Sequence, residues 1–127
     1  MVKLPEIQSQ ALAKTLGELR TQGYELFKAV TAVDYGTYLE VVYILYNLST
    51  RQHELVTVKL PPENPEIETA TKIFPAADWF EREMSEMFGI KIRGRKTDRL
   101  LLKEWNGAEP PLRKSFKWQN RGYKTLE

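Results

Sequence analysis

The sequence predicts an α+β fold, in which an N-terminal helix precedes a three-stranded antiparallel meander, further helices and an extended basic C-terminal tail. Three observations support this prediction. Apolar residues recur at helical spacing over residues 6–22, β-branched and aromatic residues dominate residues 24–60, and no periodic pattern continues beyond Gly89. The 127 residues have the length of a single domain.

Residues 6–22 are predicted to form one amphipathic helix. Pro5 stands just before its first turn, where proline is tolerated, and Gly23 stands where a glycine commonly ends a helix. The apolar residues that define its buried face are Ile7, Ala11, Leu12, Leu16 and Leu19.

The meander is predicted from residues 24–60. Residues 24–34 and 38–48 are rich in strand-forming residues and are separated by the turn signal Tyr35-Gly36, which indicates a hairpin. Residues 53–60 then alternate in a way that is typical of a third, partly exposed strand.

Prolines divide the chain after the meander. The segment 61–65 is predicted to be a loop, because proline removes backbone donors and disfavours helix in the residue before it. Residues 66–73 are predicted to form a short helix and residues 76–88 a second one that ends at Gly89. The apolar stripe of this second helix comprises Phe80, Met84, Met87 and Phe88.

Charge is distributed unevenly along the chain. Residues 1–90 contain 8 Lys/Arg and 13 Asp/Glu, whereas residues 91–127 contain 11 Lys/Arg and 4 Asp/Glu. We therefore expect an α+β core over 1–90 and a basic segment over 91–127 that docks on a partner, both within one domain. The partner of such a segment is acidic, whether protein, nucleic acid or lipid headgroups.

Several classes of function are disfavoured by composition. Without cysteine, the chain cannot bind an iron–sulfur cluster through thiolates or form a disulfide, and we expect no metal, no cofactor and no catalytic residues in it. The N-terminus lacks the apolar stretch of a signal peptide, which favours a cytoplasmic location. The apolar run at residues 41–46 is far too short to cross a bilayer.

Residues 78–86 hold the densest group of charges. Glu83 and Glu86 are helical neighbours and could form an acid/base pair or a carboxylate metal site, but no histidine accompanies them. A solvated helix face is the favoured interpretation. A small hydrolase that works through Asp78, Glu81 or His53 is an alternative, and it requires these residues to meet at a concave site.

The tail offers another alternative. Residues 110–118 interleave cations with aromatic side chains, as grooves for single-stranded nucleic acid do. The segment follows prolines and shows no signature of a known RNA-binding module, so a partner other than nucleic acid is favoured.

Two separated motifs resemble a known family. The first runs through Glu81-Arg82-Glu83, Glu86 and Met87-Phe88-Gly89-Ile90 to a basic run ending at Arg99; the second joins Leu100-Leu101-Leu102 to Pro111-Leu112-Arg113-Lys114. Their order and spacing resemble the 30 kDa subunit family of respiratory complex I, nearest to the short versions in membrane-bound [NiFe]-hydrogenase-like and related archaeal complexes. The chain differs from the usual family pattern at Glu86, Arg95 and Pro110.

The resemblance implies a non-catalytic accessory subunit, peripheral on the inner face of the cell membrane. Its implied partners are a large [NiFe]-hydrogenase-like (49 kDa-type) subunit and a small iron–sulfur subunit, with indirect contact to membrane subunits; the [NiFe]-type or quinone site and the iron–sulfur clusters would lie in those partners. The residues expected at the interfaces of this hetero-oligomer are Arg82, Glu83, Glu86, Arg99, Trp105, Leu112, Arg113, Lys114 and Phe116.

Overall fold

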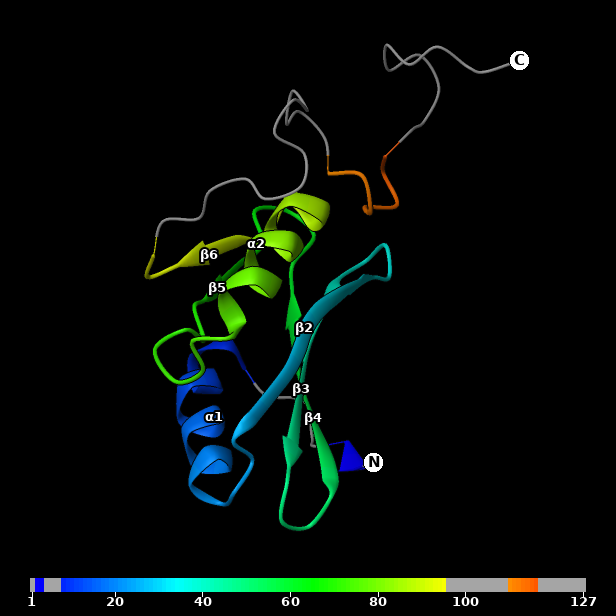
Figure 1. Cartoon of the computed structure of the whole chain (residues 1–127). Coiled ribbons are helices and arrows are strands. Elements are labelled where there is room, and N and C mark those ends of the chain that lie inside the picture. Colours follow the sequence, from blue (N-terminus) through cyan, green and yellow to red (C-terminus); the bar gives the residue numbers. More distant parts are fainter. Residues whose placement is uncertain (1, 4–7, 96–109, 117–127) are drawn as a thin grey trace, which may run out of the picture.

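The computed structural model describes residues 2–3, 8–95 and 110–116 (Figure 1). The predicted α+β class is confirmed: an N-terminal helix and an antiparallel meander precede a further helix and a parallel strand pair. In chain order the elements are β1 (Val2–Lys3), the 3-10 turn η1 (Ser9–Ala11), α1 (Leu12–Thr21), β2 (Leu26–Asp34), β3 (Leu39–Asn47), β4 (Gln52–Leu60), β5 (Glu66–Glu68), α2 (Ala77–Phe88) and β6 (Lys91–Arg93).

The predicted meander is the centre of the fold. β2 pairs with β3 and β3 with β4, both antiparallel, so the strands that follow one another in sequence are neighbours in space. β1, which the sequence did not predict, adds to the other side of β4 in parallel orientation. The sheet order β1-β4-β3-β2 leaves β2 at one edge.

Both helices cover the same face of this sheet (Figure 1). Alternation along β3 buries Val41, Tyr43 and Leu45 on that face, as period-two side-chain geometry requires. Phe27 of β2 connects the sheet to helix α2. Its ring lies 5.9 Å from that of Phe80 on α2 and 6.3 Å from that of Tyr43 on β3. These contacts fix α2 against the edge strand β2.

The predicted helix at residues 66–73 is wrong. Glu66–Glu68 is instead the strand β5, which pairs in parallel with β6. Ile67 and its partner Ile92 are buried, while the carboxylate of Glu66 lies 3.7 Å from the ammonium of Lys91 and 4.0 Å from the guanidinium of Arg93. Burial of one face and charge pairing on the other stabilise a strand pair that brings two distant segments together.

The helix predicted at residues 76–88 is confirmed as α2. It ends where Gly89 adopts a left-handed conformation with φ of 70°, the usual geometry of a glycine after a helix. Residues 110–116, hereafter the strap, return to this end of α2: the backbone N–H of Leu112 donates to the carbonyl of Met87 at 2.9 Å. In Figure 1 the strap lies beside the turn between β2 and β3.

Substituting Gly89 by alanine is expected to lower the free energy of unfolding by about 1–2 kcal/mol, because alanine resists the left-handed conformation. Its Cβ would also lie 2.6 Å from Cγ of Pro110 in the strap. The matched control is Gly17→Ala in α1, where a Cβ meets nothing within 4 Å. Urea denaturation should show the control stabilised by about 0.5–1 kcal/mol; equal effects of the two variants would contradict this account.

Candidate functional site

Helix α2 directs a carboxylate into the core. Glu81 occupies the same helical stripe as the buried residues Ala77, Met84 and Phe88, at spacings of three and four, so helix geometry points its side chain inward. Its exposed fraction is 0%. The interpretation of residues 78–86 as a solvated helix face is therefore wrong for Glu81.

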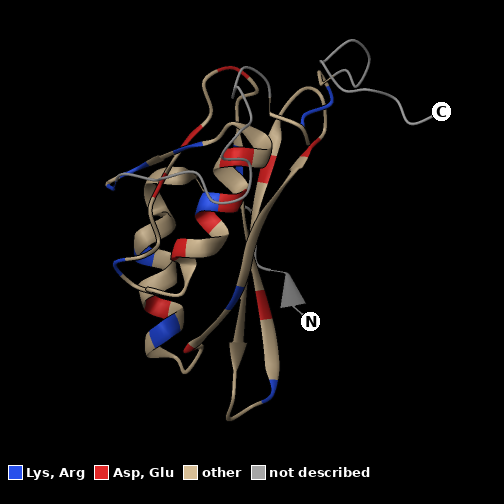
Figure 2. Cartoon of the chain, turned by 45° about the horizontal axis from the view of Figure 1, so that its top comes forward, with Lys and Arg blue, Asp and Glu red and all other residues tan. Residues whose placement is uncertain are grey.

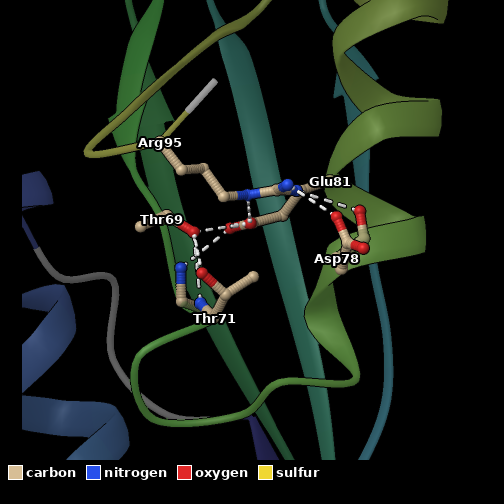
Figure 3. A network of polar contacts seen from close by, with 6 residues as sticks. Thr69, Thr71, Asp78, Glu81 and Arg95 are labelled. Atoms are coloured by element: carbon tan, nitrogen blue, oxygen red, sulfur yellow. Dashed lines mark hydrogen bonds and ion pairs between the residues drawn. The ribbon is translucent and has the colours of Figure 1, made fainter. Parts of the chain in front are cut away.

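Both oxygens of the Glu81 carboxylate accept hydrogen bonds (Figure 3). The hydroxyl of Thr69 donates to Oε1 at 2.8 Å, and the backbone N–H of Ala70 donates to Oε2 at 2.8 Å. Nε of Arg95 donates to Oε1 at 3.2 Å and supplies the opposite charge. A buried carboxylate needs such partners, because its transfer from water costs several kcal/mol.

Arg95 extends this network to the first turn of α2. Its Nη1 lies 2.5 Å from Oδ1 of Asp78, and its Nη2 donates to the Asp78 carbonyl at 3.0 Å. On the other side, the hydroxyl of Thr71 lies 2.7 Å from that of Thr69, which is already the donor to Glu81. The network thus joins α2, the turn after β5 and the residues that follow β6.

A second buried titratable group lies near the network. Burial raises the pKa of the Tyr43 phenol, and the negative charge of Glu81 raises that pKa further. Tyr43 is therefore neutral at physiological pH. Sequence patterns gave no sign of this proximity, since strand β3 and helix α2 are distant along the chain.

The strap is held by a different ion pair. Nε of Arg113 lies 3.2 Å from Oδ2 of Asp34, at the end of β2, and the side chains are 15% and 6% exposed. Nη2 of Arg113 also donates to the Pro62 carbonyl at 2.7 Å, and Nη1 to the Phe88 carbonyl at 3.3 Å. Figure 2 shows basic residues of the strap beside the acidic end of β2. One arginine thus fastens the strap to three parts of the fold.

Asp34 receives backbone donors as well. The N–H of Lys114 donates to Oδ2 at 2.8 Å, and that of Gly36 to Oδ1 at 2.8 Å. Burial alone would raise the pKa of Asp34, but these two donors and the charge of Arg113 outweigh it and lower that pKa.

A groove of about 230 Å³, the β2–α2 groove, lies between the edge strand and the helix. Its lining is mainly apolar, with one carboxylate contributed by Glu83, and Leu112 of the strap is 53% exposed beside it. The groove is lined by Ala29, Val30, Thr31, Phe80, Glu83, Met84, Met87, Phe88 and Leu112.

The structure brings together some of the residues predicted at interfaces. Glu83 and Leu112 both line the β2–α2 groove. Arg82 lies on the outer side of α2, with its guanidinium carbon 5.2 Å from the centre of the Trp79 ring, and Glu86 is half-buried on the same helix. Three of these predicted interface residues thus come from helix α2 and Leu112 comes from the strap.

The remaining predicted interface residues belong to the strap or lie outside the residues that the structure describes. Arg113 and the backbone of Lys114 bind Asp34, and Phe116 is buried. Arg99 and Trp105 lie outside the described residues.

The residues of the hydrolase alternative do not converge. Asp78 and Glu81 are joined through Arg95, whereas the His53 ring packs at 4.6 Å on Tyr46, which points away from the helix-covered face of the sheet. Within residues 8–95 and 110–116, no three His, Asp or Glu side chains gather as they would around a metal ion. Neither described helix has the length and apolar composition needed to cross a membrane.

Replacing Arg95 by methionine is expected to lower the free energy of unfolding by about 3 kcal/mol, because the buried Glu81 carboxylate loses its counter-charge. The double variant Arg95→Met with Glu81→Gln should lose less free energy of unfolding than the sum of the losses of the two single variants. The difference, which is the coupling energy, should be at least about 1 kcal/mol. Lys72→Met, at an exposed position, is the control and should change stability by less than about 0.5 kcal/mol. Additive losses in urea denaturation would show that the ion pair has no energetic role.

The Asp34 carboxyl is expected to titrate below the ordinary pKa of 3.8. Because its pKa is lowered on folding, its stabilising contribution is present at neutral pH and is lost as pH falls through the folded-state pKa. NMR shifts of the Gly36 and Lys114 amides should report this titration, and Arg113→Met should move the midpoint upward. A wild-type midpoint at or above 3.8 would contradict the assignment.

Comparison with known proteins places these features in a family. Residues 5–122 match the family described as respiratory-chain NADH dehydrogenase, 30 Kd subunit. An NADH-quinone oxidoreductase subunit of Rhizobium meliloti is 37% identical over 124 residues, which are 91% of this chain and 62% of that protein. The subunit of the same kind from Moorella thermoacetica is 33% identical over 121 residues, which are 94% of this chain and 80% of that protein.

Solved structures share the fold. A chain of the membrane-bound sulfane sulfur reductase, an archaeal respiratory membrane complex, matches 90% of this chain and 71% of its own length with a TM-score of 0.83 at 24% identity. The trypsin-resistant fragment of Nqo5 matches 72% of this chain and 79% of the fragment with a TM-score of 0.67 at 24% identity. This chain spans about half to three-fifths of several curated relatives, 48% of the Sinorhizobium medicae protein for example. The match over residues 5–122 shows that the chain belongs to the 30 kDa subunit family of respiratory-chain NADH dehydrogenase.

Proposed function

We propose that this chain is a non-catalytic accessory subunit of a membrane-bound, ion-pumping oxidoreductase complex, of the complex I or [NiFe]-hydrogenase-like type. The observation that supports it most is the family match over residues 5–122, since this family consists of subunits of a respiratory-chain enzyme. The fold it shares with a chain of an archaeal respiratory membrane complex is consistent with the same role.

The geometry of α2 supports an accessory role. The side chains best suited to acid/base chemistry, Asp78 and Glu81, are both bound by Arg95, and Glu81 accepts two further hydrogen bonds. Such a network holds elements together. A general base needs instead an accessible carboxylate within reach of a substrate proton.

The exposed apolar side chains support docking on partner chains. Leu112 of the strap is 53% exposed and Trp79 of α2 is 59% exposed, and large exposed side chains of this kind are candidates for burial in a protein contact. In this proposal the partners are the large 49 kDa-type subunit and the iron–sulfur subunit, which would hold the [NiFe]-type or quinone site and the clusters. The chain would then lie on the cytoplasmic face, and its contact with membrane subunits would be indirect.

The test is affinity purification of the chain, tagged at native abundance, from detergent-solubilised membranes of its source. A large redox subunit and an iron–sulfur subunit are expected to be recovered with it in equal amounts, as mass spectrometry and iron analysis can measure. Recovery of the chain alone, or with proteins unrelated to redox enzymes, would overturn the proposal.

The accessory role has its own test in the assembled complex. His53→Gln and Glu83→Gln are expected to leave turnover per assembled complex unchanged, because neither side chain would touch a reacting atom. A loss of turnover of tenfold or more in a fully assembled complex would assign chemistry to this chain, since tenfold corresponds to about 1.4 kcal/mol of barrier.

A further inference from the structure

β2 is an edge strand of the four-stranded sheet. Among the described strands it pairs only with β3, so the backbone groups on its other side are available to a further strand. Its first half is protected by an irregularity between Phe27 and Ala29 and by the exposed Lys28, which are common devices against edge pairing. Residues 30–33 have no charge, proline or register shift. Within the part of the chain that the structure describes, the second half of β2 is therefore an unprotected edge.

The β2–α2 groove lies along this unprotected half. Val30 and Thr31 form one wall, and Met84 and Met87 of α2 belong to the other. Methionine is flexible and adapts to the shape of an inserted side chain. The groove can thus receive an apolar side chain from a strand that lies beside β2.

The rim of the groove carries a negative charge and an exposed apolar side chain whose backbone is held in place. Glu83 is exposed there and presents a negative charge. Leu112 is held in place because its N–H binds the Met87 carbonyl and because the neighbouring Arg113 is paired with Asp34. An apolar side chain on a fixed backbone loses little entropy when a partner covers it.

We propose that a partner protein of the complex adds an extended segment to the free edge of β2, next to residues 30–33. One of its apolar side chains would enter the β2–α2 groove and contact Leu112, and a lysine or arginine would face Glu83. This inference rests on the proposed function, and it names the surface through which the chain binds its partner. Free backbone groups beside side-chain pockets recognise an extended peptide, in the manner of strand addition.

The test is hydrogen–deuterium exchange of the tagged complex and of the isolated chain. Amides of residues 30–33 that point away from β3 are expected to exchange at least about tenfold more slowly in the complex, because strand addition protects them. Equal exchange in the two samples would overturn the inference. So would slow exchange already present in the isolated chain, whether from its own segments or from a second copy.

Substitutions at the rim give an independent measurement. Leu112→Lys and Glu83→Lys are each expected to weaken binding of the chain to the rest of the complex by about tenfold or more. Leu48→Lys is the matched control, since Leu48 is 66% exposed at the opposite end of the sheet, and it should leave binding unchanged. Circular dichroism shows that each variant is folded before its affinity is compared.

The outcomes separate this inference from the proposed function. If redox subunits are recovered with the chain but residues 30–33 stay unprotected and the rim variants bind normally, the chain is an accessory subunit that uses another surface. If no redox protein is recovered with it, both ideas fail together.

Discussion

The buried carboxylate of Glu81 joins helix α2 to the turn after β5 and to the residues after β6. A negative charge without solvent is costly, and here Thr69, Ala70 and Arg95 supply its hydrogen bonds and its counter-charge. Because these donors come from the turn after β5 and from the residues after β6, satisfying one side chain requires the correct position of both segments. In this way the hydrogen bonds of Glu81 connect the short parallel pair of β5 and β6 to helix α2.

Much of the fold could be predicted from sequence, because local periodicity determines it. The meander and α2 follow from alternation and from a helical stripe, each visible within a dozen residues. β5 could not be predicted, since three residues are too few to show a period of two, and the spacing of Ile67, Ala70 and Ile73 imitates a helix. Its partner β6 lies far along the chain, and only the folded structure joins them.

The site was less predictable than the fold. A signal for Glu81 was present, since it stands four residues after Ala77 and three before Met84, in the buried stripe of α2. Its acidic character favoured a solvent-exposed interpretation instead. The pairing of Asp34 with Arg113 joins a strand end to a segment without periodicity, across 79 positions, and no local pattern encodes such a contact.

Arg95 and the strap hold the two ends of helix α2. Arg95 is fixed to the first half of α2 by Asp78 and Glu81, and the strap is fixed to its far end at Met87 and Gly89. Helix α2 is thus held at both ends by residues that follow it in the sequence, so a substitution of Arg95 or in the strap acts on the position of the helix as well as on the residue replaced.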